Sequence, residues 1–181
     1  MRTAYIGMGG NLASWAGASE ETLAAAALRL DSLGRVVRRS SLYSTAPVGF
    51  AAQPRFVNAV VELETDLAPR ELLEGLLAIE QEFGRVRTAG FQNGPRTLDL
   101  DILLLGDLEI SEPGLEIPHP RLAERTFVLI PLNDIASQVV IPGCAETVEK
   151  LLDSQVSKTS PGPPDESNAV MRIESDAWDA R

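Results

Sequence analysis

Two aspartates placed two positions apart are the residues of this sequence best suited to chemistry. Asp99 and Asp101 lie in a run of alternating apolar residues that predicts a buried strand at 97–105. Because successive side chains of a strand point to opposite faces, both carboxylates point the same way, roughly 7 Å apart. Such acids repel each other, a hard cation such as Mg²⁺ relieves the repulsion, and Arg96 adds a guanidinium suited to phosphate oxygens. The spacing indicates metal-assisted phosphoryl chemistry; the alternative is an ordinary strand with two solvated acids and a surface arginine.

The elements that would hold these aspartates follow from hydrophobic periodicity and from the positions of glycine and proline. The first six expected elements have the order β-α-β-β-α-β, which is that of a ferredoxin-like layer, an α+β fold with its helices on one sheet face. We expect strands at 3–9, 35–45, 56–64 and 97–105, helices at 19–33 and 69–83, a short edge strand at 108–111, and C-terminal helices within 121–136, interrupted near Pro131, and at 145–153.

The predicted strand at 56–64 gives a second indication of a site. Phe56 and Asn58 lie opposite the apolar face of that strand, as the two aspartates lie opposite the apolar face of theirs. If the helices cover the apolar faces, all four side chains share the other face of the sheet. A phenylalanine and an amide there require a ligand or a loop to cover them. We therefore expect the substrates on the sheet face opposite the main helices.

Length and charge limit the function classes. The 181 residues suit a single domain, which we place at 1–156, followed by a flexible acidic tail containing proline and serine at 157–181, in which 169–173 could form a short strand. The formal net charge of −10 argues against nucleic-acid and anionic-membrane partners and leaves small molecules. The single cysteine, Cys144, fits a reducing compartment, and we find neither a signal-like start nor an apolar run of membrane length. We expect a cytoplasmic protein.

Six segments match, in order, the motifs of one enzyme family. They are YIGMGGNL at 5–12, YSTAPVG at 43–49, QPRFVNA at 53–59, GRVR at 84–87, the aspartate segment at 94–105, and IPHPR at 117–121 followed by RTF at 125–127. On these motifs the chain resembles the 6-hydroxymethyl-7,8-dihydropterin pyrophosphokinases of folate biosynthesis. The resemblance extends from about residue 3 to residue 153 without a large gap.

The resemblance implies a Mg²⁺-dependent diphosphotransferase. Such an enzyme moves pyrophosphate from its co-substrate ATP to the hydroxymethyl group of a reduced pterin, giving AMP and the pterin diphosphate, with two Mg²⁺ ions bound. The transfer needs alignment and charge neutralisation rather than a covalent nucleophile. In agreement, the sequence has no Gly-x-x-x-x-Gly-Lys phosphate loop. The resemblance also implies a monomer whose partners are its two small-molecule substrates.

Residue roles also follow from the resemblance. Asp99 and Asp101 would bind the metal ions, and with Arg96 and Arg87 they would form the catalytic set. Other roles remain open, because a lone histidine is often structural, either phenylalanine can be a core residue, and the arginines after the second helix can be solvated. ATP contacts are implied for Glu80, Arg85, Arg87, Arg96, Leu98, Ile102, His119 and Arg125, and pterin contacts for Thr45, Val48, Phe56, Asn58 and Phe127.

The sequence departs from the family pattern at four positions. Gln92 and Gly114 stand where members have basic residues, which predicts a lower nucleotide affinity, and Gly10 and Asn93 replace a common serine and tryptophan. Two rival classes remain. A different Mg²⁺-dependent nucleotide-transfer enzyme would not need two phenylalanines and an asparagine together. A non-catalytic sensor of small ligands would not need an aspartate pair beside several arginines.

The segment 86–94 yields a first prediction. It contains two glycines and few apolar anchors, so it is expected to open easily and to close over bound substrates. We expect Arg87→Ala to slow turnover more than it weakens ATP binding. Gln92→Arg should tighten ATP binding, because Gln92 offers no charge to the phosphates. Hydrogen exchange across 86–94, with and without an ATP analogue plus pterin, checks this closure, and unchanged protection would contradict it.

Overall fold

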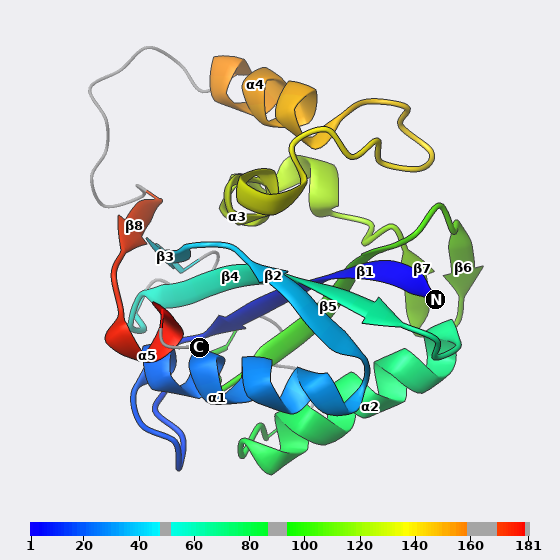
Figure 1. The fold of residues 1–181 in the computed structure, drawn as a ribbon. Helices are drawn as coiled ribbons and strands as arrows, with labels where there is room; N and C mark the ends of the chain where they lie inside the picture. The colour runs from blue at the N-terminus through cyan, green and yellow to red at the C-terminus, as the bar shows by residue number, and fades with distance from the viewer. Residues whose placement is uncertain (48–51, 87–93, 159–169, 180–181) are drawn as a thin grey trace.

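A six-stranded antiparallel sheet forms the centre of the structure, a computed structural model that describes residues 1–47, 52–86, 94–158 and 170–179. The central strand is β1 (Arg2–Gly10), which lies between β4 (Phe56–Thr65) and β5 (Asp99–Leu105). Both neighbours run antiparallel to β1, so the two strands that carry the predicted site residues are aligned on it (Figure 1).

The far edge of β4 is occupied by two short strands in succession. These are β2 (Arg35–Arg39) and β3 (Leu42–Thr45), and a strand from the C-terminal end of the chain, β8 (Met171–Ile173), pairs with β3. The sheet therefore has the order β5-β1-β4-β3-β8, with β2 also paired to β4.

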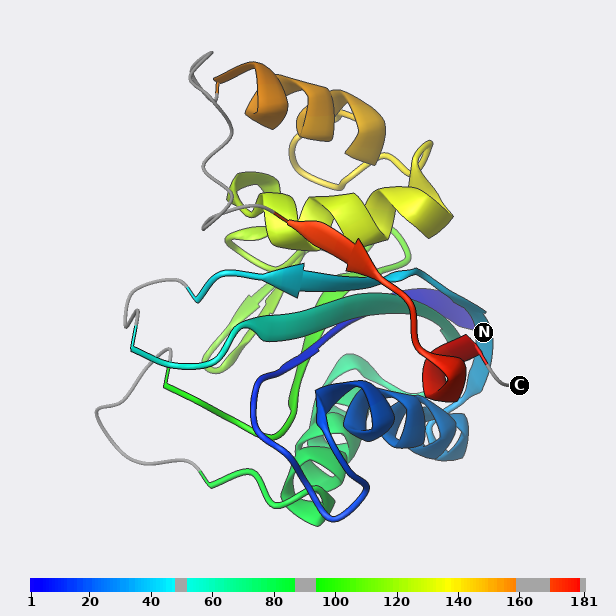
Figure 2. The same ribbon diagram turned by 90° about the vertical axis from the view of Figure 1, so that its left-hand side faces the viewer.

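Two helices, α1 (Ser19–Arg29) and α2 (Pro69–Glu82), cover one face of the sheet (Figures 1 and 2). Proline suits the first position of α2 because its missing N–H would have no partner there, and the Glu71 carboxylate accepts the Ala68 N–H at 2.9 Å. A 3₁₀ turn, η1 (Leu30–Ser32), extends α1. The apolar sides of the helices and of the sheet form one continuous core. The expected strands at 3–9, 56–64 and 97–105 and both expected helices are confirmed.

The opposite face is covered by the later part of the chain. Helix α3 (Thr126–Ala136) packs on β4, and α4 (Val148–Lys158) packs on α3 (Figure 1). Tyr5, Val60 and Leu103 form a second core cluster with residues of these helices. The chain reaches α3 through the hairpin of β6 (Ile110–Glu112) and β7 (Leu115–Ile117) and a 3₁₀ turn, η2 (Leu122–Glu124).

The strand expected at 35–45 is divided at Ser40. Ser40 donates its backbone N–H to the Val60 carbonyl at 2.9 Å, and its hydroxyl oxygen accepts the Val60 N–H at 2.9 Å. A side-chain oxygen thus takes the place of a backbone carbonyl in the ladder. Because Ser and other short polar residues can satisfy backbone groups in this way, they compete with regular pairing. The result is a joint between β2 and β3 rather than one long strand.

Two further elements differ from expectation. The edge strand expected at 108–111 corresponds to β6, which pairs with β7 and not with the main sheet. Pro131 does not interrupt α3, which continues from Thr126 to Ala136. Proline removes a single N–H, the one that would reach the Phe127 carbonyl, and the tightly buried apolar side of α3 keeps the helix intact.

A shift in the β1–β5 register changes one predicted side-chain direction. Alternation places Leu104 on the same face as Leu98, but the register shifts between Tyr5 and Ile6. As a result Leu104 packs beneath α3 with Leu103, and Leu105 takes the helix-side position. Both aspartates precede this change on β5, so their predicted direction is unaffected.

Residues 170–179 contain the short strand expected at 169–173, but they pack on the domain and do not form a flexible tail. They contain β8 and α5 (Asp176–Asp179), and Trp178 is only 4% exposed. Helix α4 also runs to Lys158, past the expected domain limit. Most of the expected linker, together with Val48, Arg87, Gln92 and Asn93, falls outside the described residues. In the described part of the chain, each helix is too short or too polar to cross a membrane.

Candidate active site

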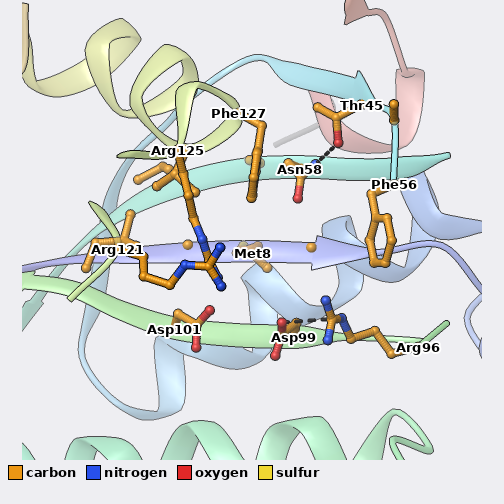
Figure 3. A pocket seen from close by; sticks show the side chains of 17 residues that line it. Met8, Thr45, Phe56, Asn58, Arg96, Asp99, Asp101, Arg121, Arg125 and Phe127 are labelled. Carbon is orange, nitrogen blue, oxygen red and sulfur yellow. Dashed lines mark hydrogen bonds and ion pairs between the residues drawn. The ribbon is translucent and has the colours of Figure 1, made fainter. Parts of the chain in front are cut away.

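An open cavity lies on the sheet face opposite α1 and α2, where the sequence predicts the substrates (Figure 3). The space within it, part of which is open to solvent, amounts to about 840 Å³. Strands β3, β4 and β5 and the start of α3 all contribute side chains to it. The predicted site residues that line the cavity are Thr45, Phe56, Asn58, Arg96, Asp99, Asp101, Arg125 and Phe127.

Two glycines of the central strand make room for this cavity. Gly9 of β1 is paired with Asn58 on one side and with Asp99 on the other, and Gly7 is paired with Asp101. Residues directly opposite each other in a sheet share a face, so each glycine lies in a row with the polar groups of the neighbouring strands. A β-carbon on Gly9 would lie 2.7 Å from Asn58 Oδ1. The floor of the cavity is therefore bare backbone between two polar walls.

The carboxylate pair on β5 is electrostatically unfavourable without a cation. Burial, then repulsion from Asp99 and Glu80, raise the pKa of Asp101 to about 6, although Arg125 and Arg85 act in the opposite direction. Among the residues that the structure describes, no cluster of three or more His, Cys, Asp or Glu side chains forms a metal cage. Two carboxylates at an open cavity instead fit Mg²⁺, which commonly takes one or two carboxylates and completes its shell with water and substrate phosphates.

A buried ion pair behind the aspartates supports β5. Glu80 of α2 is 1% exposed and accepts the Leu100 N–H at 2.8 Å. Arg85, just beyond α2, pairs with both Glu80 and Asp99. The guanidinium thus connects the end of the helix to a candidate metal ligand. Glu80 supports β5 and does not line the cavity, and the ATP contact that the resemblance implies for it stays a prediction.

The wall opposite the aspartates combines an amide with two aromatic rings. Asn58 Nδ2 donates to Thr45 Oγ1 at 2.7 Å, which fixes the amide and leaves Oδ1 facing the cavity (Figure 3). Phe56 is 8% exposed, and the Arg96 guanidinium lies 5.1 Å from its ring centroid. Phe127 enters from the first turn of α3. Flat rings and an oriented amide suit a planar heterocycle with donors and acceptors on one edge.

Arginines surround the carboxylate half of the cavity. Arg96 Nε lies 3.3 Å from Asp99 Oδ2, an ion pair without hydrogen-bond geometry. Arg121 and Arg125 line the cavity from the chain that leads into α3. Burial, then repulsion from Arg121, lower the pKa of Arg125. This crowding of like charges is relieved by an anion, and guanidinium groups bind phosphate oxygens well.

His119 lies beside the cavity and not in its lining. Its backbone N–H donates to the Leu103 carbonyl at 2.9 Å, and its Nδ1 accepts the Arg121 N–H at 3.1 Å. A neutral ring that accepts at Nδ1 carries its proton on Nε2. Burial and the charge of Arg125 lower the pKa of His119, which keeps the ring neutral near pH 7. These contacts hold Arg121 in place; the phosphate contact of His119 stays a prediction.

One asparagine joins three segments at the mouth of the cavity. Asn11 is 5% exposed, and its Nδ2 donates to Gln53 Oε1 at 3.0 Å and to the Pro54 carbonyl at 2.9 Å. Its Oδ1 accepts the Arg96 N–H at 2.9 Å, and its own N–H donates to the Arg96 carbonyl at 2.9 Å. Asn11 therefore fixes the backbone of Arg96 relative to the segment that enters β4.

Some predicted residues are not brought to the cavity. Leu98 and Ile102 are 0% and 6% exposed in the helix-side core, because alternation along β5 directs them away from the aspartates. The ATP contacts that the resemblance implies for these two residues stay predictions, and their backbone is the part available to make them. Val48 and Arg87 lie outside the described residues. Arg121, one of the arginines whose positive charge in the sequence suits a nucleotide, does line the cavity, whereas no sequence pattern marked Gly9 or Asn11 as a site residue.

We expect Asp101→Asn to stabilise the metal-free protein at neutral pH. Since the pKa of Asp101 in the fold is raised to about 6 from 3.8, its contribution to stability is full below pH 3.8 and is lost as the pH rises through 6. Asparagine removes that loss, a gain on the order of 1–3 kcal/mol. Denaturant unfolding in EDTA at pH 7.5 and pH 4 measures the gain, which should fall to about half a kcal/mol or less at pH 4.

The control is Asp153→Asn, at an exposed position of α4, which should change stability little at either pH. An equal gain from Asp101→Asn at both pH values would contradict the electrostatic explanation.

Comparison with known proteins places the chain among pterin enzymes. The family model for 7,8-dihydro-6-hydroxymethylpterin-pyrophosphokinase (HPPK) matches residues 5–137. The 2-amino-4-hydroxy-6-hydroxymethyldihydropteridine pyrophosphokinase of Pseudomonas aeruginosa is 46% identical over 140 residues, which cover 76% of this chain and 83% of that protein. The enzyme of the same name from Haemophilus influenzae is 42% identical over 166 residues, which cover 89% of this chain and 100% of that protein.

Solved structures agree at the level of the fold. The crystal structure of Plasmodium falciparum HPPK-DHPS with pteroate matches 86% of this chain with a TM-score of 0.69 at 16% sequence identity. This chain spans 44% of the length of that solved chain. The sequence matches, which extend over most of the molecule, settle the relationship: the chain belongs to the 7,8-dihydro-6-hydroxymethylpterin-pyrophosphokinase family.

Proposed function

We propose that the cavity over β1, β4 and β5 is the active site of this pyrophosphokinase. The chain transfers pyrophosphate from ATP to the hydroxymethyl group of 6-hydroxymethyl-7,8-dihydropterin, the step of folate biosynthesis that yields AMP and the pterin diphosphate. One observation carries the location: Asp99, Gly9 and Asn58 form a single row across three strands. That row places a candidate metal ligand and a candidate pterin ligand on either side of an open floor.

The pterin is proposed to bind at the β4 wall. Asn58 Oδ1 accepts from the amino group of the heterocycle, and the backbone at Thr45 and Val48 completes that edge. The ring lies between Phe56 and Phe127, whose faces stack on a flat heterocycle. The fixed Asn58–Thr45 hydrogen bond supports this assignment, because it holds the amide in one orientation before any ligand arrives.

The phosphates of ATP are proposed to lie over β5. Arg96, Arg121 and Arg125 neutralise the charge that develops during transfer, and Arg85 keeps Asp99 oriented. Asp99 and Asp101 would hold Mg²⁺, for which we propose two ions. When bound, Mg²⁺ supplies charge neutralisation and lowers the pKa of the attacking hydroxyl group. The remaining predicted ATP ligands, Arg87 and His119, stay part of this proposal.

Broader assignments remain proposals as well. The order β5-β1-β4 with β2 and β3 together as the next strand, and with α1 and α2 on one face, supports the description as a ferredoxin-like layer. The catalytic domain expected at 1–156 is proposed to include β8 and α5 as well, because β8 joins the main sheet and Trp178 lies in the helix-side core. We also retain a cytoplasmic monomer, which the strongly acidic composition and the single cysteine support.

The decisive test is product analysis with ATP, Mg²⁺ and the reduced pterin. We expect AMP only when the pterin is present. Release of ADP would favour the rival nucleotide-transfer enzyme, and ligand binding without turnover would favour the sensor. Asp99→Asn should lower turnover by more than about tenfold at saturating Mg²⁺, a barrier increase above ~1.4 kcal/mol. Asp107→Asn, at an exposed position just beyond β5, is the matched control and should retain activity.

Another prediction concerns Gly9, which lies at the floor of the cavity. Gly9→Ala should displace the Asn58 amide, because the new β-carbon would meet Asn58 Oδ1 at 2.7 Å. We expect pterin binding to weaken by about tenfold or more and binding of a non-hydrolysable ATP analogue to change less than about twofold. Calorimetric titration measures both ligands.

The cause of that loss is tested by a double-mutant cycle. In an Asn58→Ala background, Gly9→Ala should have little further effect, since the group it displaces is gone. If the two substitutions weaken pterin binding additively, Gly9→Ala does not act by displacing the Asn58 amide.

A further inference from the structure

The C-terminal elements β8 and α5 lie beyond residues 5–137, the segment that the family model matches. β8 pairs with β3 over three residue pairs, from Leu42–Ile173 to Ser44–Met171. It thereby covers the outer edge of β3, whose backbone groups would otherwise face solvent. β3 ends at Thr45, the residue whose hydroxyl accepts the Asn58 amide at 2.7 Å. The C-terminal segment is thus one strand away from the proposed pterin wall.

Trp178 anchors this segment. Its side chain is 4% exposed within the helix-side core, and α5 packs against α1 (Figures 1 and 2). The indole Nε1–H donates to the Ser40 carbonyl at 2.8 Å, and the Arg39 guanidinium lies 5.3 Å from the ring centroid. A buried indole with its N–H satisfied combines a large apolar contact with a directional one. The directional contact is made at the joint between β2 and β3.

That joint is also tied to the cavity. Ser40 exchanges two hydrogen bonds with Val60, a cavity-lining residue two positions along β4 from Asn58. On the other side of the joint, Asp134 of α3 accepts the Ser41 N–H at 3.1 Å and the Tyr43 hydroxyl at 2.9 Å. The start of β3 is therefore held from three directions: by β4, by α3 and by Trp178.

The aspartate half of the cavity has separate supports. Asp99 and Asp101 lie on β5, at the opposite end of the sheet order β5-β1-β4-β3-β8. Their neighbours behind the strand are Glu80 and Arg85, which come from α2 and the residues after it. A displacement of β3 is therefore expected to move Thr45 and Asn58 more than it moves the aspartates proposed to bind the metal.

We infer that Trp178 is a positioning residue for the pterin: through Ser40 and β3 it keeps Thr45, and with Thr45 the Asn58 amide, in the binding orientation. This inference rests on the proposed function of the cavity. It assigns to residues 170–179 a role in substrate affinity, selective for one of the two substrates.

The test compares steady-state kinetics of wild type and Trp178→Ala in the full chain. We expect the KM for the pterin to rise about tenfold, with the KM for ATP and kcat each changed less than about twofold. Trp178→Phe keeps an aromatic ring, although a smaller one, but cannot donate to Ser40, so a smaller rise of about threefold is expected. Met171→Ala, on the same segment but 45% exposed and still able to pair through its backbone, is the matched control and should leave all three constants unchanged.

Other results would contradict either the role of Trp178 or the proposed function. Equal rises in both KM values, or a fall in melting temperature with unchanged KM values, would show that Trp178 serves stability alone. If Trp178→Ala does not fold, Trp178→Phe decides, and an unchanged pterin KM in that variant rejects the inference. If the wild type produces no AMP, the proposed function itself is rejected. If the wild type is active but the pterin KM of the Trp178 variants is unchanged, only the role of Trp178 is rejected.

Discussion

The site depends on a strand that carries no side chains where its neighbours carry their polar groups. Gly7 and Gly9 meet this requirement on β1 and leave an open floor between β4 and β5. Glycine in a strand costs roughly 0.5–1 kcal/mol relative to alanine. Pairing along both edges of β1 offsets the cost, and its other face is filled by Ala4, Ile6 and Met8, all at most 3% exposed. One face of the central strand thus packs into the helix-side core, and the other leaves space for the cavity at its glycines.

Charge imposes the second requirement. Burial, and after it repulsion from Asp99 and Glu80, raises the pKa of Asp101, and Arg125 and Arg85 only partly compensate. Repulsion therefore remains among the carboxylates and among the arginines of the site. A divalent cation bound to the carboxylates and a polyphosphate bound to the arginines would reduce it. Such conflicts between stability and function are expected at active sites and are tolerated because the rest of the fold is well packed.

Local sequence patterns were sufficient for much of this arrangement. Alternation on the strands at 56–64 and 97–105 correctly placed Phe56, Asn58 and both aspartates on one face, because a two-residue period needs no knowledge of distant partners. The failures have non-local causes. The position of Leu104 depends on a register shift against β1, and the break at Ser40 depends on a contact with Val60. The packing of residues 170–179 depends on Trp178 reaching a carbonyl 138 positions earlier, which composition cannot reveal.

The distance in sequence between β3 and its edge partner has a consequence for biosynthesis. A ribosome makes β3 more than a hundred residues before it makes β8, so β3 lacks its edge partner while the residues between them are being made. Exposed strand edges invite pairing with other chains. Short length and polar residues limit that hazard here, since β3 has four residues and includes Ser44 and Thr45. β8, which is made long after the strands it joins, then covers this edge of β3.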